Sequence, residues 1–327
     1  MLLKFAKSNQ PVIVILIPLI GLIIWYNPLS LSQNIQSTSQ TAMPLYSLLH
    51  SILQPHIFVS KLVGLVLFLS ISFYLNHLNT KYIFIAERTY LPSIIYITIV
   101  CIHINFKNLY PAIPATLFLL ISIDRLFDSY KEEKLTYNVF DSGMLIGIAS
   151  LFYFNMIFFI VFFWAALIIV RQFYWREWIY ILMGISIPYL LLFSFYYMTN
   201  RSFEDIFQAI NDNFLVHHKV LLNKIQYIAG GYILLLLLLA SQYIIRIFPS
   251  KKILARKSFN LFLVAFLVSM AIYLFIPSAS NEMIFITTIP VSFLISQYFI
   301  RPRKLRWLEI IFDLLIIVLI LSQVILL

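Results

Sequence analysis

Residues 141–176 read DSGMLIGIASLFYFNMIFFIVFFWAALIIVRQFYWR, and this stretch decides how the chain is organised. It is a long apolar run with Asn155 near its middle and with Arg171 and Arg176 at its far end. A single helix over residues 142–170 would cross a bilayer once, whereas a turn near Asn155 would make it a hairpin of two short passes. The choice between them sets the direction of every helix that follows.

The distribution of basic residues separates the two possibilities, because cytoplasmic loops of membrane proteins are rich in Lys and Arg. A single pass would place outside both arginines of the stretch and the later basic segments at 251–257 and 301–306. A hairpin places all of these inside. It leaves five basic residues outside: Lys61, Lys107, Arg201, Lys219 and Lys224. The sequence therefore predicts a short helical hairpin over 142–170, with passes of about 12–15 residues, or roughly 18–22 Å each.

The composition indicates an all-α, polytopic transmembrane helical bundle that forms a single integral membrane domain over residues 1–327. Hydrophobic residues make up 62% of the chain and charged residues 11%, whereas a soluble domain is about half apolar and about one quarter charged. The net charge of +10 is attributed to cytoplasmic loops and not to binding of nucleic acid. The single cysteine, Cys101, lies in an apolar run, so an internal disulfide is excluded.

Apolar runs and charges together predict eleven spans in a bacterial inner (cytoplasmic) membrane, with a cytoplasmic N-terminus and the C-terminus outside. The predicted spans are residues 11–26, 56–75, 90–106, 111–123, the two passes of 142–170, 178–197, 227–248, 260–276, 285–300 and 308–326.

The loops of this arrangement have distinct characters. Residues 124–141 form the most charged segment and are expected to be a cytoplasmic loop. Residues 27–55 and 200–226 are expected to be outer loops. Each carries a piece with apolar residues at helical spacing, at 43–55 and over most of 200–226, which predicts amphipathic helices lying on the outer membrane surface.

Ionisable residues inside a membrane are costly, so they are default functional candidates. Asp313 in the last span is the clearest, with Glu309 one turn before it. An ion pair with Arg306 or with a neighbouring helix would explain both acids, and a proton or ion relay is the alternative. The chain has only seven glycines, which argues against the glycine-broken helices of ion-coupled transporters.

The outer face carries the acids and bases that a substrate there would meet: Glu204, Asp205, Asp212, Glu282, His217 and His218. Glu204, Asp205 and Asp212 are the candidate catalytic residues, with a solvated helix face as the alternative. Adjacent histidines on a helix point about 100° apart, so the His pair does not predict a metal site. No HExxH, GxSxG, Walker or CxxC motif occurs, and no metal or cofactor is predicted.

The inner face offers four arginines as candidates for binding anionic lipid headgroups: Arg88, Arg125, Arg171 and Arg176. The alternative is a structural ion network between helices at the cytoplasmic boundary, which would include the neighbouring acid Asp128.

Four segments resemble an uncharacterised family of bacterial multi-spanning inner-membrane proteins of about this length. They are ERTYLPS (87–93), YPAIPATLFLL (110–120), FDSGMLIGIASLFYF (140–154) and WREW (175–178), so the resemblance covers roughly residues 85–200. No established activity follows from it.

Residues 146–173 are also similar in architecture to GT-C type lipid-linked-sugar glycosyltransferases, in which an aliphatic helix turns into a short return helix followed by a basic residue and WR. That resemblance implies many spans and an essential acid in the first outer loop. Residues 27–55 contain no Asp or Glu, and no DxD occurs in an outer loop. The chemistry is therefore expected to be absent, altered or supplied by the three acids at 204–212.

Three classes of function stay open. The first is envelope glycoconjugate assembly with a polyprenyl-phosphate-linked substrate, on a GT-C-like scaffold that has lost or changed its acid. The second is a non-catalytic membrane subunit or assembly factor with a membrane protein partner. The third is a lipid or small-solute transporter or flippase. Membrane lipids are partners in every case.

Overall fold

The computed structural model describes residues 3, 6, 17–22, 43–85, 87, 89–103, 109–131, 136–170, 174–215, 224–247, 249, 253–300 and 306–326. Every regular element in these ranges is helical, which confirms the all-α class. The elements are α3 (Pro44–Leu53), α4 (Ile57–Tyr82), α5 (Leu91–His103), α6 (Ala112–Lys131), α7 (Thr136–Phe152), the 3-10 helix η1 (Phe154–Phe159), α8 (Ile160–Val170), α9 (Trp175–Met198), α10 (Glu204–Leu215), α11 (Lys224–Ile247), α12 (Ile253–Phe275), α13 (Met283–Phe299) and α14 (Arg306–Leu326).

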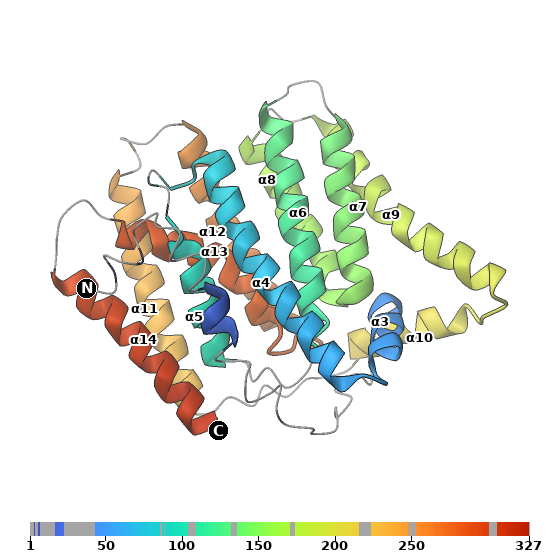
Figure 1. Ribbon diagram of the computed structural model, residues 1–327. Coiled ribbons are helices and arrows are strands. Elements are labelled where there is room, and N and C mark those ends of the chain that lie inside the picture. The colour runs from blue at the N-terminus through green and yellow to red at the C-terminus, as the bar shows by residue number, and fades with distance from the viewer. Residues whose placement is uncertain are drawn as a thin grey trace.

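The helices form a bundle in which α3 and α10 lie at one end, whereas the end of α6 and the start of α7 lie at the other (Figure 1). We call these the α3/α10 end and the opposite end. At the α3/α10 end, α3 contacts the segment before α6: the Tyr46 hydroxyl donates to the Leu109 carbonyl. Lys81 at the end of α4 pairs with Asp124 and Asp128 of α6 at 2.8 Å, at the opposite end.

The central apolar stretch is broken, as the charge distribution predicts. Helix α7 ends at Phe152, Tyr153 adopts an extended conformation with φ −136° and ψ 107°, and η1 follows at Phe154. The Asn155 amide donates to the Ser278 carbonyl at 3.3 Å and accepts from the Ser278 hydroxyl at 2.9 Å. Two helices therefore replace one, and the break is tied to the turn between α12 and α13.

Four helices are long and apolar enough to cross a membrane by length and composition: Ile57–Tyr82, Trp175–Met198, Lys224–Ile247 and Ala255–Phe275. Shorter apolar helices occupy Leu91–Ile102, Tyr137–Phe152, Phe154–Ile169 and Met283–Phe299. A helical bundle with several apolar helices is thus confirmed, whereas eleven spans go beyond what these lengths establish. The first predicted span is described only at residues 17–22.

The charged segment 124–141 differs from the expected loop. Helix α6 continues to Lys131 and α7 already begins at Thr136, so only residues 132–135 fall outside the two helices, and these lie outside the described residues. The reason is that α6 carries its acids where they find partners, since Asp124 and Asp128 both accept hydrogen bonds from Lys81 and Tyr82. The charges of this segment are thus compatible with a helix, because they are paired with residues of α4.

Helices α7 and α9 pack closely through glycines. A Cβ atom placed on Gly147 would lie 2.8 Å from the Ile185 carbonyl oxygen, and one placed on Gly184 would lie 2.8 Å from the Met144 nitrogen. Gly143 likewise faces the backbone of Ile181. Small residues at helix interfaces let backbones approach within an apolar environment, so these glycines fix how α7 and α9 sit together.

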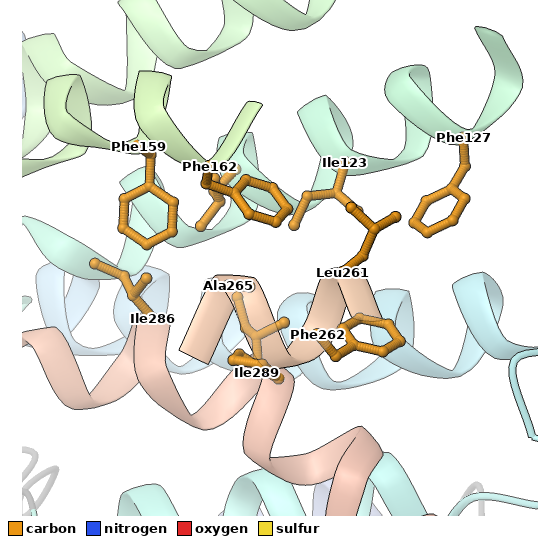
Figure 2. A pocket seen from close by; sticks show the side chains of 11 residues that line it. Ile123, Phe127, Phe159, Phe162, Leu261, Phe262, Ala265, Ile286 and Ile289 are labelled. Carbon is orange, nitrogen blue, oxygen red and sulfur yellow. The ribbon is translucent and has the colours of Figure 1, made fainter. Parts of the chain in front are cut away.

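The interior between α6, α8, α12 and α13 is filled by side chains that point toward one another (Figure 2). The Phe262 ring stacks on Phe293 with centroids 4.4 Å apart. The gap that remains among these side chains has a volume of about 10 Å³, which is room for about one water molecule. This part of the bundle is packed core, so a ligand site has to lie elsewhere.

Replacing Gly184 by Ala should destabilise the bundle, although Gly→Ala inside a helix ordinarily gains about 0.5–1 kcal/mol. The added methyl group overlaps the backbone of α7, and overpacking of this kind costs about 1–3 kcal/mol. The matched control is Gly231→Ala on α11, where nothing lies within 4 Å of the added Cβ. Thermal unfolding of both variants in the same detergent measures the difference, and equal unfolding temperatures would contradict close packing of α7 and α9.

Candidate functional site

Polar side chains from four parts of the chain gather at the α3/α10 end. They are Tyr46 of α3, Tyr110 just before α6, Tyr153 and Asn155 at the helix break, and Glu282 at the start of α13; together we call them the Glu282 cluster. The Tyr153 hydroxyl accepts from the Asn155 amide at 3.0 Å. Because the members come from distant positions, only the folded bundle assembles them.

Glu282 is the one acid of this cluster. Its carboxylate accepts the Ala112 N–H at 3.3 Å, at the start of α6, where the free amides and the helix dipole favour a negative charge. None of the described lysine, arginine or histidine residues forms an ion pair with it. The ionised form of Glu282 is therefore stabilised by the Ala112 N–H and by the N-terminus of α6.

Burial dominates the electrostatics of the cluster. It raises the pKa of Glu282 from the ordinary value of 4.5 to about 7, and the hydrogen bond from Ala112 opposes the shift. Burial, reinforced by the charge of Glu282, also raises the pKa values of Tyr46, Tyr110 and Tyr153. Glu282 can thus change between acid and base near neutral pH, while the three tyrosines stay neutral donors. A carboxyl group tuned in this way suits proton transfer.

A lateral apolar cavity of about 330 Å³ opens between α5, α11, α12 and α13, and we call it the α11 cavity. Its walls include Ile99, Tyr227, Met270 and Thr287. Gly231 faces it with open space at its Cβ position. Met283 and Ile284, which follow Glu282 directly, also line it. The cavity and the acid are therefore held by the same first turn of α13.

The predicted catalytic acids lie elsewhere. Glu204, Asp205 and Asp212 are exposed on α10, whose Ile206 is buried and whose Phe214 packs edge-on against Phe154 with ring centroids 4.9 Å apart. This agrees with a helix that lays one apolar face on the protein and turns its charged face outward. The predicted pair His217 and His218 lies outside the described residues.

The arginines predicted to bind lipid headgroups are only partly placed. Arg125 and Arg176 are exposed on α6 and α9, whereas Arg88 and Arg171 lie outside the described residues. Between α4 and α6 the structure has the ion network of the alternative interpretation, but its cation is Lys81. The Tyr82 hydroxyl also binds Asp124 and Asp128, at 2.6 and 2.8 Å.

Glu309 and Asp313, the acids predicted to lie within the membrane, are on α14 and are partly buried. The Oδ1 atom of Asp313 is buried and has no hydrogen-bond partner, and no ion pair of Asp313 with Arg306 occurs within the described ranges. The expected pairing therefore does not explain this residue. Among the described residues, no group of three or more His, Cys, Asp and Glu side chains is placed to hold a metal ion.

No protein-family model matches the chain, and no curated protein or solved structure matches it either.

The sequence places Glu282 on the outer face but does not single it out. An acid that directly precedes an apolar run, after the turn residues PSASN at 277–281, was the available signal. Its neighbours Tyr46, Tyr110 and Tyr153 are 129 to 236 positions away in the printed numbering, and their approach could not be read from spacing.

The stability of the protein should fall as pH rises through about 7, because the folded chain binds the Glu282 proton more tightly than the unfolded chain does. Folding raises this pKa from 4.5 to about 7, so the stabilisation is complete below about pH 4.5 and is lost above about pH 7. Glu282→Gln keeps an acceptor for the Ala112 N–H and cannot ionise. We expect its unfolding temperature to vary less between about pH 5 and 8 than that of the natural chain, by an amount equivalent to about 1–3 kcal/mol.

The control for this experiment is Glu204→Gln, which removes an exposed carboxylate and should leave the pH dependence of the natural chain intact. Identical pH profiles for the natural chain and Glu282→Gln would show that Glu282 ionises as freely in the folded as in the unfolded state.

Proposed function

We propose that the chain is an integral protein of the bacterial inner membrane that crosses it eleven times, with the N-terminus cytoplasmic and the α3/α10 end outside. Support comes from apolar side chains that stay exposed along whole helices, such as Met183 and Leu190 of α9 and Leu235 and Leu238 of α11. Apolar surface of this extent is covered by lipid in membrane proteins. With this orientation the basic segments would face the cytoplasm, as the positive-inside rule requires.

The function that we propose is envelope glycoconjugate assembly with a polyprenyl-phosphate-linked substrate, bound from the outer leaflet. The observation that supports it is the α11 cavity, which is apolar and is lined in part by Met283 and Ile284, the residues that follow Glu282. An isoprenoid chain is apolar and suits such a cavity, and the phosphate and sugar would then reach the Glu282 cluster. Within the cluster, the Glu282 carboxylate and the tyrosine hydroxyls are the groups that a sugar would meet, whereas the Asn155 amide is already bound to Tyr153 and Ser278.

If the protein is an enzyme, it is a glycosyltransferase in which Glu282 takes the proton from the acceptor. This assignment accounts for the absence of acids from residues 27–55, since the acid comes from the turn before α13. In the proposed reaction α10, with Glu204, Asp205 and Asp212, supports the break at η1 and takes no part in proton transfer.

Two alternatives keep specific support. A non-catalytic membrane subunit would need no acid in the first outer loop, and it would retain a membrane protein partner at fixed stoichiometry. A transporter or flippase is favoured by the buried, unpartnered Oδ1 of Asp313, because a carboxyl group at membrane depth is a usual proton or ion carrier.

Filling the α11 cavity should remove the lipid. Gly231→Phe places a ring in open space, so binding should fall about tenfold or more, equivalent to about 1.4 kcal/mol or more, while the fold is kept. Leu238→Phe is the control, because Leu238 is exposed on the same helix and does not line the cavity. Mass spectrometry of lipids that co-purify in mild detergent measures the effect. Bulk phospholipid alone in the natural chain, together with a retained protein, would move the conclusion to the subunit.

The three classes of function also respond differently to mutation in a strain that depends on the protein. We expect Glu282→Gln to abolish the change in envelope glycans that the natural chain supports, because a base with a pKa near 7 is lost. The triple alanine variant at Glu204, Asp205 and Asp212 should retain most of it. Loss on Asp313→Asn with no loss on Glu282→Gln would favour transport, and retention by every variant would favour the subunit.

A further inference from the structure

A second apolar cavity, of about 320 Å³, opens at the α3/α10 end between α3, α7 and α9, and we call it the α9 cavity. Its walls include Leu48 of α3, Leu151 of α7, and Pro188, Leu191 and Phe195 of α9. Leu191 and Phe195 are also exposed, so the cavity opens sideways onto the surface that the proposed membrane would cover.

This cavity follows from the packing of α7 on α9. The two helices touch at Gly143, Gly147 and Gly184, and a Cβ on Gly147 would also meet the Pro188 ring at 3.0 Å. Beyond this contact α9 diverges from α7 on its way to α10 (Figure 1), and α3 closes part of the space. Because rigid helices and not loops form the walls, the cavity is preformed.

Both cavities are lined by residues that neighbour members of the Glu282 cluster in the sequence. Met283 and Ile284 follow Glu282 and line the α11 cavity. Leu45 precedes Tyr46 and Leu151 lies two residues before Tyr153, and both leucines line the α9 cavity. The α11 cavity is walled by α5, α11, α12 and α13, so the two cavities share neither a residue nor a helix.

We propose that the two cavities hold two lipid chains at once, so that the acceptor, like the donor, is a lipid, and its free hydroxyl meets the donor headgroup at the Glu282 cluster. This rests on the proposed function, in which the α11 cavity holds the polyprenyl chain. Volumes of this size suit a stretch of a single chain and are too small for a helix of a partner protein, whose diameter with side chains is about 10–12 Å. The almost entirely apolar walls do not suit a polar acceptor.

The transfer step between two such lipids balances. The hydroxyl oxygen of the acceptor forms a bond to the anomeric carbon of the sugar, and the bond from that carbon to the phosphate oxygen of the donor breaks. The phosphate keeps the electron pair of the broken bond. The hydroxyl proton passes to the Glu282 carboxylate, which can hold it near neutral pH and later release it to water.

Photocrosslinking in vesicles tests the proposal with the full chain. The probes are a polyprenyl phosphate and a diacylglycerol, each with a diazirine in its chain, and the labelled peptides are mapped by mass spectrometry. We expect the polyprenyl probe to label peptides of α11 and α13, and the diacylglycerol probe to label those of α7 and α9. Each label should be competed only by the matching unlabelled lipid.

Variants separate the two cavities. Gly231→Phe should reduce the polyprenyl label alone by about tenfold, and Leu191→Trp should reduce the diacylglycerol label alone by a similar factor. Leu190→Trp is the control, because Leu190 is exposed on the same helix and does not line the α9 cavity.

Three results would overturn the proposal. They are the absence of label on α7 and α9, competition there by any phospholipid, and loss of both labels in Gly231→Phe. Polyprenyl label on α11 without specific label on α9 would reject the second lipid and keep the proposed function. Absence of polyprenyl label from α11 would reject the proposed function itself.

Discussion

An amide side chain in the middle of an apolar hairpin has to find hydrogen-bond partners, and this requirement ties the bundle together. Asn155 finds them on Ser278, whose carbonyl and hydroxyl lie 3.3 and 2.9 Å away. A buried polar group without a partner costs about 1–3 kcal/mol, so the break between α7 and α8 and the turn between α12 and α13 stabilise each other. Tyr153, one residue before η1, adds contacts with Ser280 at 3.4 Å.

That link explains why a polar site can exist in so apolar a chain. It holds the start of α13 against the start of α6, where the Ala112 amide meets the Glu282 carboxylate. The same turn brings Tyr153 beside Glu282 and continues into Met283, which lines the α11 cavity. A membrane bundle usually satisfies its backbone within each helix, so helix breaks and helix starts are the places where polar groups remain available. The Glu282 cluster is built from several of these places.

The sequence predicts the helical class, the break near Asn155 and an amphipathic helix within residues 200–226, of which the structure describes Glu204–Leu215, because each depends on local composition or on the sum of charges. It overestimates the loop at 124–141, because Asp124 and Asp128 pair with Lys81 of another helix. These partners lie 43 and 47 positions away in the sequence. It also favours Glu204, Asp205 and Asp212 over Glu282 as catalytic residues. The three acids lie in a polar segment, whereas Glu282 is a single acid before an apolar run. Polarity along a chain reports what is solvated, whereas a perturbed carboxyl group depends on burial, and burial is set by tertiary contacts.

The glycine contact between α7 and α9 and the hydrogen bonds at Ser278 constrain the same hairpin from opposite sides. If Glu282 served only to cap α6, a glutamine would also supply the acceptor, and the charge would add only the modest interaction with the helix dipole, about 0.3–1 kcal/mol. A carboxylate that lies near three tyrosines and lacks a cationic partner in the described part of the chain is a poor choice for stability alone, since burial opposes its ionisation. The residues that follow it, Met283 and Ile284, line the α11 cavity, so in the proposed function its protonation would be coupled to what that cavity holds.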